Sequence, residues 1–429
     1  MSLVGKPGYK ETAIGWIPND WNSEQLGRFI TLLTGAPFKS ELFSSDEGIP
    51  LIRIRDLLRG FSETGYVGEY DDRYLVEAGD VLVGMDGDFH VVRWKGSRAL
   101  LNQRVLKISA KPGLSDEGFL FFLVASAIGK IQDGISATTV KHLSTKDLQN
   151  LTAAIPPLPE QQKIAAILTA VDDKLDIIAR QIESTQTLKR GLMQTLFSRG
   201  VGTQDTNGRW VPHTEFKDSE LGKIPGGWDV VQIQAIAEVI RGASPRPQGD
   251  PRYYGGDVPR LMGADVTRDG KWVTPRIDFL TQEGAKRSRP CTKGTLTIIC
   301  SGDVGIPSFL AVDACIHDGF LALINVDELK ANKNYLYHVI YSLKQKLDAS
   351  ATHGGVFTNL TTGILKEFRL PLPPTNEQEK IALTLDIMDE KLAIAAKKRA
   401  DYQTLKQGLM QKLLTGEWRV KLDKEAVAA

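Results

Sequence analysis

The sequence predicts an α+β protein with two mixed α/β domains in a pseudo-two-fold tandem repeat, separated by two long helices that form an antiparallel coiled coil. The first observation is an opening motif written twice, at 9–21 and again at 216–228. The second is a repeated closing segment, at 155–165 and 372–382, and the third is a heptad pattern after each copy. The residues between these borders differ almost completely, which favours one scaffold presenting two different recognition surfaces.

A chain of 429 residues is too long for one ordinary hydrophobic core and suits two globular domains with connecting elements. Its 42% hydrophobic and 24% charged residues are typical of a soluble globular protein. Its apolar runs fall short of the roughly 20 residues that a membrane-spanning helix needs. The repeat predicts five segments: domain 1 at 1–155, a first spacer helix at 156–200, domain 2 at 201–372, a second spacer helix at 373–418 and a C-terminal tail at 419–429.

Charge and cysteine content bear on the partner and the compartment. A net charge of +1 gives no support to indiscriminate nucleic-acid binding, although it is compatible with a local basic face. Cys291, Cys300 and Cys315 are odd in number and widely spaced, which argues against a disulfide framework. The N-terminal residues lack the basic patch and apolar core of a signal peptide, so we expect a cytoplasmic protein without a membrane anchor.

Each domain begins with a proline turn followed by a tryptophan, Trp21 or Trp228, which we expect to anchor the domain edge. Residues 50–55 alternate apolar and basic side chains as a half-buried strand does, which places Arg53 and Arg55 on one strand face. The other expected elements are strands at 78–87 and 104–108 with a helix at 117–130 in domain 1, and strands at 260–263, 293–299 and 320–324 with a helix at 334–347 in domain 2.

Proline-rich segments at 155–159 and 370–374 favour extended backbone that cannot continue a helix or a sheet, so we expect a hinge at each. The heptad spacing that follows predicts helices of about 38 residues, or about 57 Å, and each needs the other to cover its apolar stripe. Lys189, Arg399 and Lys406 interrupt this seam. They mark either a place where the helices splay or meet another protein, or stems that lie along the seam with their charges in water. The expected seam residues are Ile164, Leu168, Val171, Leu175, Ile178, Ile182, Ile381, Leu385, Met388, Leu392, Leu409 and Leu413.

The sequence has no pattern of a catalytic or cofactor site. The phosphate-loop pattern is absent, as is the Asn/Asp-Pro-Pro-Tyr/Phe motif of amino-group DNA methyltransferases. The glycine-rich runs at 83–87 and 301–305 match no dinucleotide fingerprint. Cys300, Cys315 and His317 lack the spacing of a metal site. We therefore expect no catalytic residue and no metal in this chain, which is predicted not to be an enzyme.

The doubled frame resembles the DNA-specificity (S) subunit of type I restriction–modification systems over nearly the whole chain. The resemblance is carried by the two opening motifs, by Pro-Pro-Leu-Pro-Glu-Gln-Gln at 156–162 and by Leu-Lys-Arg-Gly-Leu-Met at 188–193, each with a second copy. It implies that each domain is a target recognition domain that reads one half of a split DNA site. It also implies that the coiled coil is a ruler that sets the unread gap between the halves.

The resemblance further implies the partners of the chain. These are double-stranded DNA, two modification subunits that carry S-adenosylmethionine and the adenine-methylating site, and two ATP- and Mg-dependent restriction subunits that can join the assembly. No cofactor is expected on this chain itself, and the expected role is defence against foreign DNA.

Direct base readout uses Arg or Lys for guanine, Asn or Gln for adenine and carboxylates for cytosine, while Lys, Arg, Ser and Thr contact the backbone. Apart from Arg53 and Arg55, the domain 1 candidates lie in segments expected to be polar loops, and in domain 2 the segment 242–248 is expected to be an exposed loop. The DNA-binding candidates are Arg53, Arg55, Arg93, Lys95, Arg98, Thr138, Thr139 and Lys141 in domain 1, and Arg241, Ser244, Arg246, Gln248, Arg260, Arg268, Lys271, His353 and Asn359 in domain 2.

The main alternative is an adaptor whose two domains bind other proteins, with the coiled coil as a spacer. The near-neutral charge favours this alternative, whereas the basic loops and the repeated borders count against it. A fused restriction–methylation enzyme is excluded, because the chain has neither the room nor the motifs for a catalytic domain.

Overall fold

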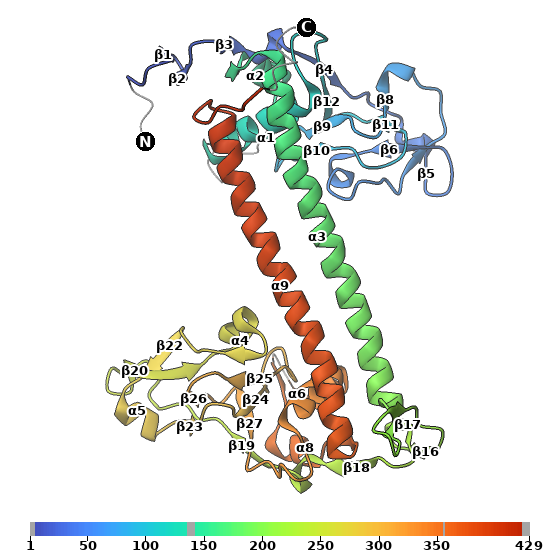
Figure 1. Ribbon diagram of the computed structural model, residues 1–429, viewed down its shortest axis with the longest axis vertical. Coiled ribbons are helices and arrows are strands. Elements are labelled where there is room, and N and C mark those ends of the chain that lie inside the picture. The colour runs from blue at the N-terminus through green and yellow to red at the C-terminus, as the bar shows by residue number, and fades with distance from the viewer. Residues whose placement is uncertain (1–4, 135–141, 355–356, 423–429) are drawn as a thin grey trace. The chain divides into compact units, whose positions relative to one another are not determined.

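The computed structural model describes residues 5–134, 142–354 and 357–422, and the chain divides into two compact units. Unit 1 comprises Met1–Arg180 and Ala396–Ala429, and unit 2 comprises Gln181–Ala395. Two long helices, α3 (Leu158–Arg199) and α9 (Thr375–Leu413), each begin in one unit and end in the other (Figure 1). The predicted fold class, two mixed α/β domains in tandem with two long helices, is confirmed.

Domain 1, in unit 1, contains a four-stranded and a five-stranded sheet. The strands of these sheets are β4 (Ile30–Thr34), β5 (Phe43–Ser44), β6 (Ile49–Ile52), β7 (Gly65–Tyr66), β8 (Leu75–Val76), β9 (Val81–Gly84), β10 (Val91–Arg93), β11 (Ala99–Leu101) and β12 (Val105–Ala110). The strand orders are β10-β9-β12-β4 and β5-β7-β6-β11-β8. The strands β6 and β11 are parallel, whereas every pair in the four-stranded sheet is antiparallel.

Further elements border these sheets. The described elements are β1 (Tyr9–Thr12), β2 (Gly15–Pro18), β3 (Asn22–Gln25), β13 (Thr152–Ile155), α1 (Glu117–Gly134), α2 (Thr145–Asn150) and the 3₁₀ turns η1 (Leu26–Arg28), η2 (Ser40–Leu42), η3 (Ile54–Asp56) and η4 (Asp72–Tyr74). The first two strands form a hairpin, and β3 pairs with β13 directly before α3 begins. The residues that directly follow the opening motif therefore pair with those that lead into the closing segment, in one small sheet.

Domain 2, in unit 2, repeats this plan with longer insertions. Its strands are β14 (Thr203–Gln204), β15 (Trp210–Val211), β16 (Phe216–Ser219), β17 (Gly222–Pro225), β18 (Asp229–Gln232), β19 (Glu238–Arg241), β20 (Tyr254–Leu261), β21 (Trp272–Val273), β22 (Asp278–Leu280), β23 (Arg289–Cys291), β24 (Leu296–Ile299), β25 (Pro307–Leu310), β26 (Ala314–Ile316), β27 (Phe320–Ile324), β28 (Thr352–Gly354), β29 (Phe357–Asn359) and β30 (Arg369–Leu372). Its helical elements are η5 (Ile233–Ala235), α4 (Gly263–Asp269), α5 (Gln282–Lys286), α6 (Lys333–Ser342), α7 (Lys344–Ser350) and α8 (Thr362–Glu367). The sheet orders are β19-β27-β24-β25-β21 and β22-β20-β26-β23.

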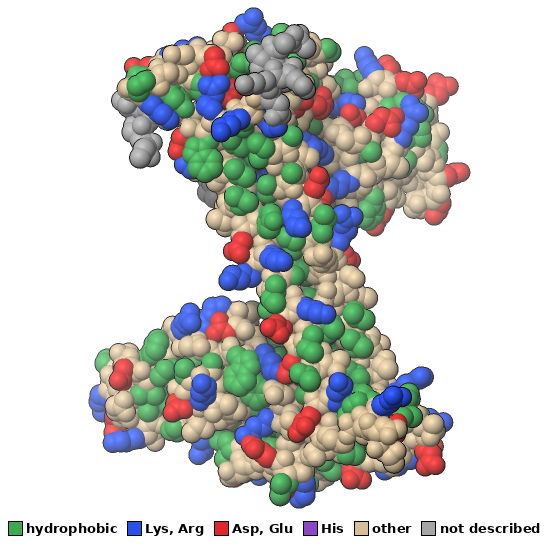
Figure 2. All heavy atoms as spheres, in the orientation of Figure 1, with side chains coloured by type: hydrophobic (Ala, Val, Ile, Leu, Met, Phe, Trp, Pro, Cys, Tyr) green, Lys and Arg blue, Asp and Glu red, His purple; other side chains and the backbone are tan. Residues whose placement is uncertain are grey.

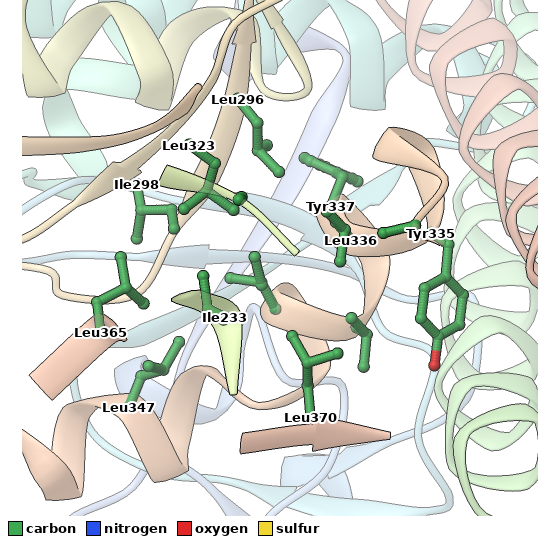
Figure 3. Packing of buried hydrophobic residues seen from close by; sticks show 14 of the residues in the cluster. Ile233, Leu296, Ile298, Leu323, Tyr335, Leu336, Tyr337, Leu347, Leu365 and Leu370 are labelled. Carbon is green, nitrogen blue, oxygen red and sulfur yellow. The ribbon is translucent and has the colours of Figure 1, made fainter. Parts of the chain in front are cut away.

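The core of unit 2 lies between its five-stranded sheet and the helices that cover it. Figure 3 shows Leu296 and Ile298 of β24 beside Leu323 of β27, with Leu336 of α6 and Leu365 of α8 in the same cluster. All five side chains are buried. The strands predicted at 293–299 and 320–324 therefore correspond to β24 and β27, in a sheet with a face sealed by helices.

The two long helices run antiparallel within each unit. In unit 1, Ile164 at the start of α3 packs with Leu413 at the end of α9, and in unit 2, Leu196 near the end of α3 packs with Ile381 near the start of α9. Of the predicted seam, Ile164, Leu168, Val171, Ile178, Ile381, Leu385 and Leu413 are buried, and Leu175, Ile182, Met388, Leu392 and Leu409 are half-buried.

The two lysines of the seam keep their charges inside the coil. Lys189 pairs with Asp389 in unit 2, and Lys406 pairs with Asp172 at 2.6 Å in unit 1. These are the same pair in the two copies of the repeat. The lysine stems thus lie along the seam, but the ammonium groups contact carboxylates of the facing helix instead of water alone. Arg399, by contrast, is exposed.

Reversing the charge of Lys189 is expected to destabilise unit 2, because Lys189→Glu places two carboxylates at one half-buried position. We expect a loss of about 2 kcal/mol in the free energy of unfolding, and recovery of most of it in the swap Lys189→Glu with Asp389→Lys. Urea unfolding followed by circular dichroism measures both. Lys391→Glu, at an exposed position of α9, is the control; an equal loss in the control would contradict the proposed role.

Several expectations about local structure are wrong. The strand expected at 50–55 ends at Ile52, because the carboxylate of Asp56 accepts a hydrogen bond from the backbone N–H of Arg53 at 2.9 Å and starts η3. Arg53 and Arg55 therefore do not share a strand face. Both proline-rich segments also continue regular structure, since Ile155 ends β13, Leu158 begins α3 and Pro371 lies in β30. A proline is tolerated there because this two-stranded sheet consists only of edges.

None of the helices in the described ranges is long and apolar enough to cross a membrane.

Candidate nucleic-acid interface

Each domain is joined to its long helix by a buried tryptophan and a buried glutamate. The indole N–H of Trp21 donates to Glu160 at 2.9 Å, and that of Trp228 donates to Glu377 at 2.8 Å. Both tryptophans are fully buried. The prediction that they anchor the domain edges is confirmed, and the anchor is the first turn of a long helix.

A glutamine next to each glutamate completes this frame. The side-chain amide N–H of Gln161 donates to the carbonyl of Pro156 at 2.9 Å, and that of Gln378 donates to the carbonyl of Pro373 at 2.7 Å. Their side-chain oxygens accept backbone N–H groups that precede α1 and α6, at 2.9 and 2.8 Å. Because both side chains are buried and hydrogen-bonded, the helix, the strand before it and the domain helix hold one geometry.

The charges of the two glutamates are balanced differently. Glu160 accepts two hydrogen bonds from the guanidinium of Arg419, at 2.8 and 2.9 Å. Glu377 instead accepts the backbone N–H groups of Val201 and Gly202, at 2.8 and 3.0 Å, and lies 3.0 Å from the ring nitrogen of His213. The Trp–Glu–Gln frame therefore occurs in both units, but the groups that hydrogen-bond to the glutamate carboxylate differ.

Five of the predicted DNA-binding residues of domain 2 gather around Asp318, in the turn between β26 and β27. Ser244 donates to its carboxylate at 2.6 Å, and Arg246 lies 3.5 Å from the other carboxylate oxygen. The cluster also contains Arg241, which donates to the Asp318 carbonyl at 3.0 Å and to Asn359 at 3.3 Å. Arg260 joins it by donating to Ser244 at 3.1 Å. We call these six residues the Asp318 cluster.

The cluster divides into a buried support and an exposed tip. The side chain of Arg260 is only 7% exposed and pairs with Asp278 at 2.7 Å, whereas the side chain of Arg246 is 69% exposed. Burial opposes ionisation of Asp318, but hydrogen bonds from Ser244 and from backbone hold the pKa of this carboxyl below its ordinary value. Arg246 is thus aimed at solvent by a charged carboxylate, with most of its five N–H donors available.

The other candidates of domain 2 lie elsewhere. Gln248 is exposed on the loop that carries Arg246. Arg268 pairs with Asp265 and Asp269 around the helix α4. Lys271 is 16% exposed and pairs with Asp386 of α9. His353 lies in β28, and its side chain is outside the described part of the structure.

Within the described part of the chain, the candidates of domain 1 do not converge. Arg53 hydrogen-bonds to the hydroxyl of Thr64, and Arg55 is exposed. Arg98 is exposed and pairs with Glu77 at 3.0 Å. Thr138, Thr139 and Lys141 lie outside the described residues.

Two cations of domain 1 contact the long helix of their own unit. Arg93 lies in the strand β10, half-buried over the ring of Phe121 at 4.7 Å, with Thr169 of α3 at 3.5 Å. The expectation that it lies in a polar loop is therefore wrong. Lys95 pairs with Asp176 of α3. Like Lys271 in domain 2, both brace a domain against its helix.

Sequence reasoning missed Asp318, although it is the centre of the domain 2 cluster. The available signal was its place in the turn His317-Asp318-Gly319, directly before a buried strand. No carboxylate was among the candidates, although carboxylates can read cytosine.

Basic and acidic side chains are interspersed on the face drawn in Figure 2. This pattern accords with the net charge of +1. It favours recognition by a few specific side chains over attraction by a broad basic surface.

Within the described residues, His338, Asp386 and Asp389 lie close enough to share a metal ion, with ligand atoms within 4.8 Å of one another. Both carboxylates are already paired, with Lys271 and Lys189. The group is therefore an ion-pair network between domain 2 and the coil.

Comparison with known proteins identifies the class. The sequence profile described as "Type I restriction modification DNA specificity domain" matches residues 18–186 and 225–401, once for each half of the repeat. The chain is thus built from two DNA specificity domains. It belongs to the family of specificity subunits of type I restriction–modification systems, and is not itself an enzyme.

Two of the relatives in this family match over nearly the full length. The type I restriction enzyme MjaVIII specificity subunit of Methanocaldococcus jannaschii is 24% identical, over 98% of each chain. The putative MjaX specificity subunit of the same organism is 28% identical over 98% of this chain and 99% of its own. The EcoBI specificity subunit of Escherichia coli is 36% identical over 45% of this chain and 40% of its own. The crystal structure of the type I S subunit from M. genitalium shares the fold, with a TM-score of 0.61 at 16% identity over 96% of this chain and 99% of that one.

Proposed function

We propose that this chain reads a bipartite DNA target, with one half-site recognised by each domain and the unread gap set by α3 and α9. The single observation that carries the proposal is the convergence of five predicted DNA-binding residues in the Asp318 cluster. A guanidinium held by a carboxylate and aimed at solvent suits bidentate readout of guanine O6 and N7 in the major groove. The neighbouring amide of Asn359 and the exposed Gln248 suit adenine.

The exposed cations away from the cluster have a different proposed role. Arg55 and Arg98 in domain 1 and Arg268 in domain 2 suit contacts to phosphates, which position the domain without reading sequence. Lys95, Arg93 and Lys271 are assigned to bracing and not to DNA.

The frame supports a proposal about partners. The Trp–Glu–Gln frame and the Lys–Asp pair occur in equivalent form in both units, so two copies of one protein can dock on equivalent surfaces. We propose two modification subunits in this place, carrying S-adenosylmethionine and the adenine-methylating site. Two ATP-dependent restriction subunits complete the proposed assembly, which acts in the cytoplasm.

Expression with the modification subunit of its own system in a host without other adenine methylation tests the proposal. Sequencing of methylated DNA is expected to give one bipartite motif. Arg246→Ala should relax one G·C pair in one half-site by roughly 5- to 150-fold and leave the other half unchanged. Arg252→Ala, an exposed arginine paired with Asp250 in the same domain, is the control.

The absence of any new methylation, with the partner and its cofactor present, would overturn the proposal and favour the adaptor alternative. Equal relaxation in both half-sites would contradict the assignment of one half to each domain.

A further inference from the structure

The region around the Asp318 cluster has an equivalent in domain 1, because the central sheets share one topology. The strands β4, β12, β9 and β10 correspond in order and direction to β19, β27, β24 and β25. In the second sheet, the parallel pair β6–β11 corresponds to β20–β26. The turn between β11 and β12 is therefore the counterpart of the turn that holds Asp318.

Backbone hydrogen bonds fix the correspondence residue by residue. The N–H of Met85 donates to the carbonyl of Arg104, and that of Cys300 donates to the carbonyl of Gly319, both at 2.9 Å. The N–H groups that follow His142 and Asn359 donate to the carbonyls of Met85 and Cys300, both at 2.8 Å.

Isolated bridges repeat the pattern at the same place. One joins Asp86 to His142 in domain 1, and the other joins Ser301 to Asn359 in domain 2. The same four chain segments thus meet in each domain.

A glycine directly after β4 and after β19 allows the segments that meet in each domain to approach each other closely. A Cβ on Gly35 would lie 2.2 Å from the carbonyl oxygen of Asn102, and one on Gly242 would lie 2.0 Å from that of His317. Both distances are too short for any side chain, so glycine is required for the strand to pass the turn. The path of the chain is therefore shared at this point, although Arg104 has a positive φ of 69° and its counterpart Gly319 does not.

The side chains on this common backbone differ at every position. The corresponding pairs, domain 1 first, are Thr34 and Arg241, Asp86 and Ser301, Asn102 and His317, Gln103 and Asp318, Arg104 and Gly319, and His142 and Asn359. A shared chain path with variable polar side chains is the arrangement expected where two domains read different sequences.

The domain 1 side chains nevertheless form the same kind of network. Arg104 donates to one oxygen of Asp86 at 2.7 Å, and the Nδ1 of His142 lies 2.7 Å from the other. The hydrogen bond from His142, together with Arg104, holds the pKa of Asp86 below its ordinary value. The Arg104 side chain is 69% exposed, as is that of Arg246 in domain 2. Gln103 is exposed beside it.

We propose that Arg104, Gln103, Asp86 and His142 form the base-reading surface of domain 1, although none of them was a candidate from the sequence. The proposal rests on the proposed function and assigns its residues. Arg104 reads a guanine, since one bond to Asp86 orients its guanidinium and leaves the remaining donors for O6 and N7. Gln103 reads an adjacent adenine, and Asp86 and His142 are positioning residues that hold Arg104.

The test uses the purified complex with its modification subunits and the methylated motif of the unaltered protein. Binding is measured to a duplex with that motif and to duplexes in which each pair of each half-site is replaced in turn. Arg104→Ala is expected to lose roughly 5- to 150-fold discrimination at one G·C pair of the half-site that domain 2 does not read. Gln103→Ala should lose discrimination at a neighbouring A·T pair. Arg104→Lys keeps the charge but not the two-pronged geometry, so it should lose the same discrimination while binding unrelated duplexes as before.

Arg73→Ala is the matched control, because Arg73 is 63% exposed and pairs with Asp71 at 3.0 Å in the same domain. Unchanged discrimination at every pair in both Arg104 variants would overturn the assignment while leaving the proposed function intact. Absence of a methylated motif from the unaltered complex would remove the proposed function itself. Assembly with the modification subunits, measured by size-exclusion chromatography, separates loss of readout from loss of folding.

Discussion

Insertion of one heptad into each long helix should lengthen the unread gap of the DNA target by about three base pairs. Seven residues add about 10.5 Å of helix, and base pairs are spaced about 3.4 Å apart. Insertion after Ile182 and after Ala395 keeps the helices matched, because the ion pairs Lys189–Asp389 and Lys406–Asp172 set a register that places these positions opposite each other. A heptad also preserves the seam, which an insertion of another length would rotate.

The measurement is the methylated motif of cells that express the lengthened chain with its modification partner. Both half-sites should keep their bases. Affinity should fall, because three base pairs also turn the second half-site by roughly 100° about the DNA axis. Seven residues inserted between Thr206 and Asn207, in the turn between β14 and β15, are the control and should leave the motif unchanged. An unchanged gap in the lengthened helices would refute the ruler.

Removal of the Glu377 carboxylate should cost unit 2 about 3–5 kcal/mol of unfolding free energy. Glu377→Ala would leave the indole N–H of Trp228, the backbone N–H groups of Val201 and Gly202, and His213 buried without their acceptor. A buried donor without an acceptor destabilises the folded state by the full free energy of its desolvation. The loss is measured by urea unfolding of the whole chain, monitored by circular dichroism.

Two variants sharpen this prediction. Glu379→Ala, at an exposed position two residues away, should change the stability by less than about 0.5 kcal/mol. Glu160→Ala should cost unit 1 less than Glu377→Ala costs unit 2, because Arg419 is part-exposed and keeps Asp20 as a partner at 2.7 Å. Equal stability of Glu377→Ala and Glu379→Ala would show that the frame does not hold the unit together.

The repeated parts of the fold were predictable from the sequence, and the parts specific to each domain were not. Heptad spacing predicts the long helices, because it depends on residues close in the chain. The recurrence of the motifs around Trp21 and Trp228 predicts the anchors. The prediction of a strand at 50–55 was wrong because the carboxylate of Asp56 accepts the backbone N–H of Arg53, and the chain turns there. Local hydrogen bonds of this kind override an alternating pattern.

The candidate site likewise contains residues that the sequence predicted and residues that only the structure revealed. The composition of residues 242–248 indicates an exposed loop, so Ser244 and Arg246 could be predicted as DNA-binding residues from the sequence. Asp86, Arg104 and His142 come from three separated segments of domain 1, and only the folded sheet brings them together. The sequence around an arginine does not indicate which carboxylate will orient its guanidinium in the folded protein.

Unit 1 is assembled from both ends of the chain, and this has a consequence for biosynthesis. The Tyr9 hydroxyl donates to the carbonyl of Gly416 at 2.9 Å, and Glu160 accepts its hydrogen bonds from Arg419 only after that residue has been synthesised. The residues of unit 2, by contrast, are contiguous in the chain. On the ribosome, unit 2 can therefore close as soon as it emerges. The first domain to be translated is the last to be completed, after a delay on the order of ten seconds or more at ordinary elongation rates. A chain that terminated before Gly416 would thus contain all residues of unit 2 but lack the contacts that Gly416 and Arg419 make in unit 1.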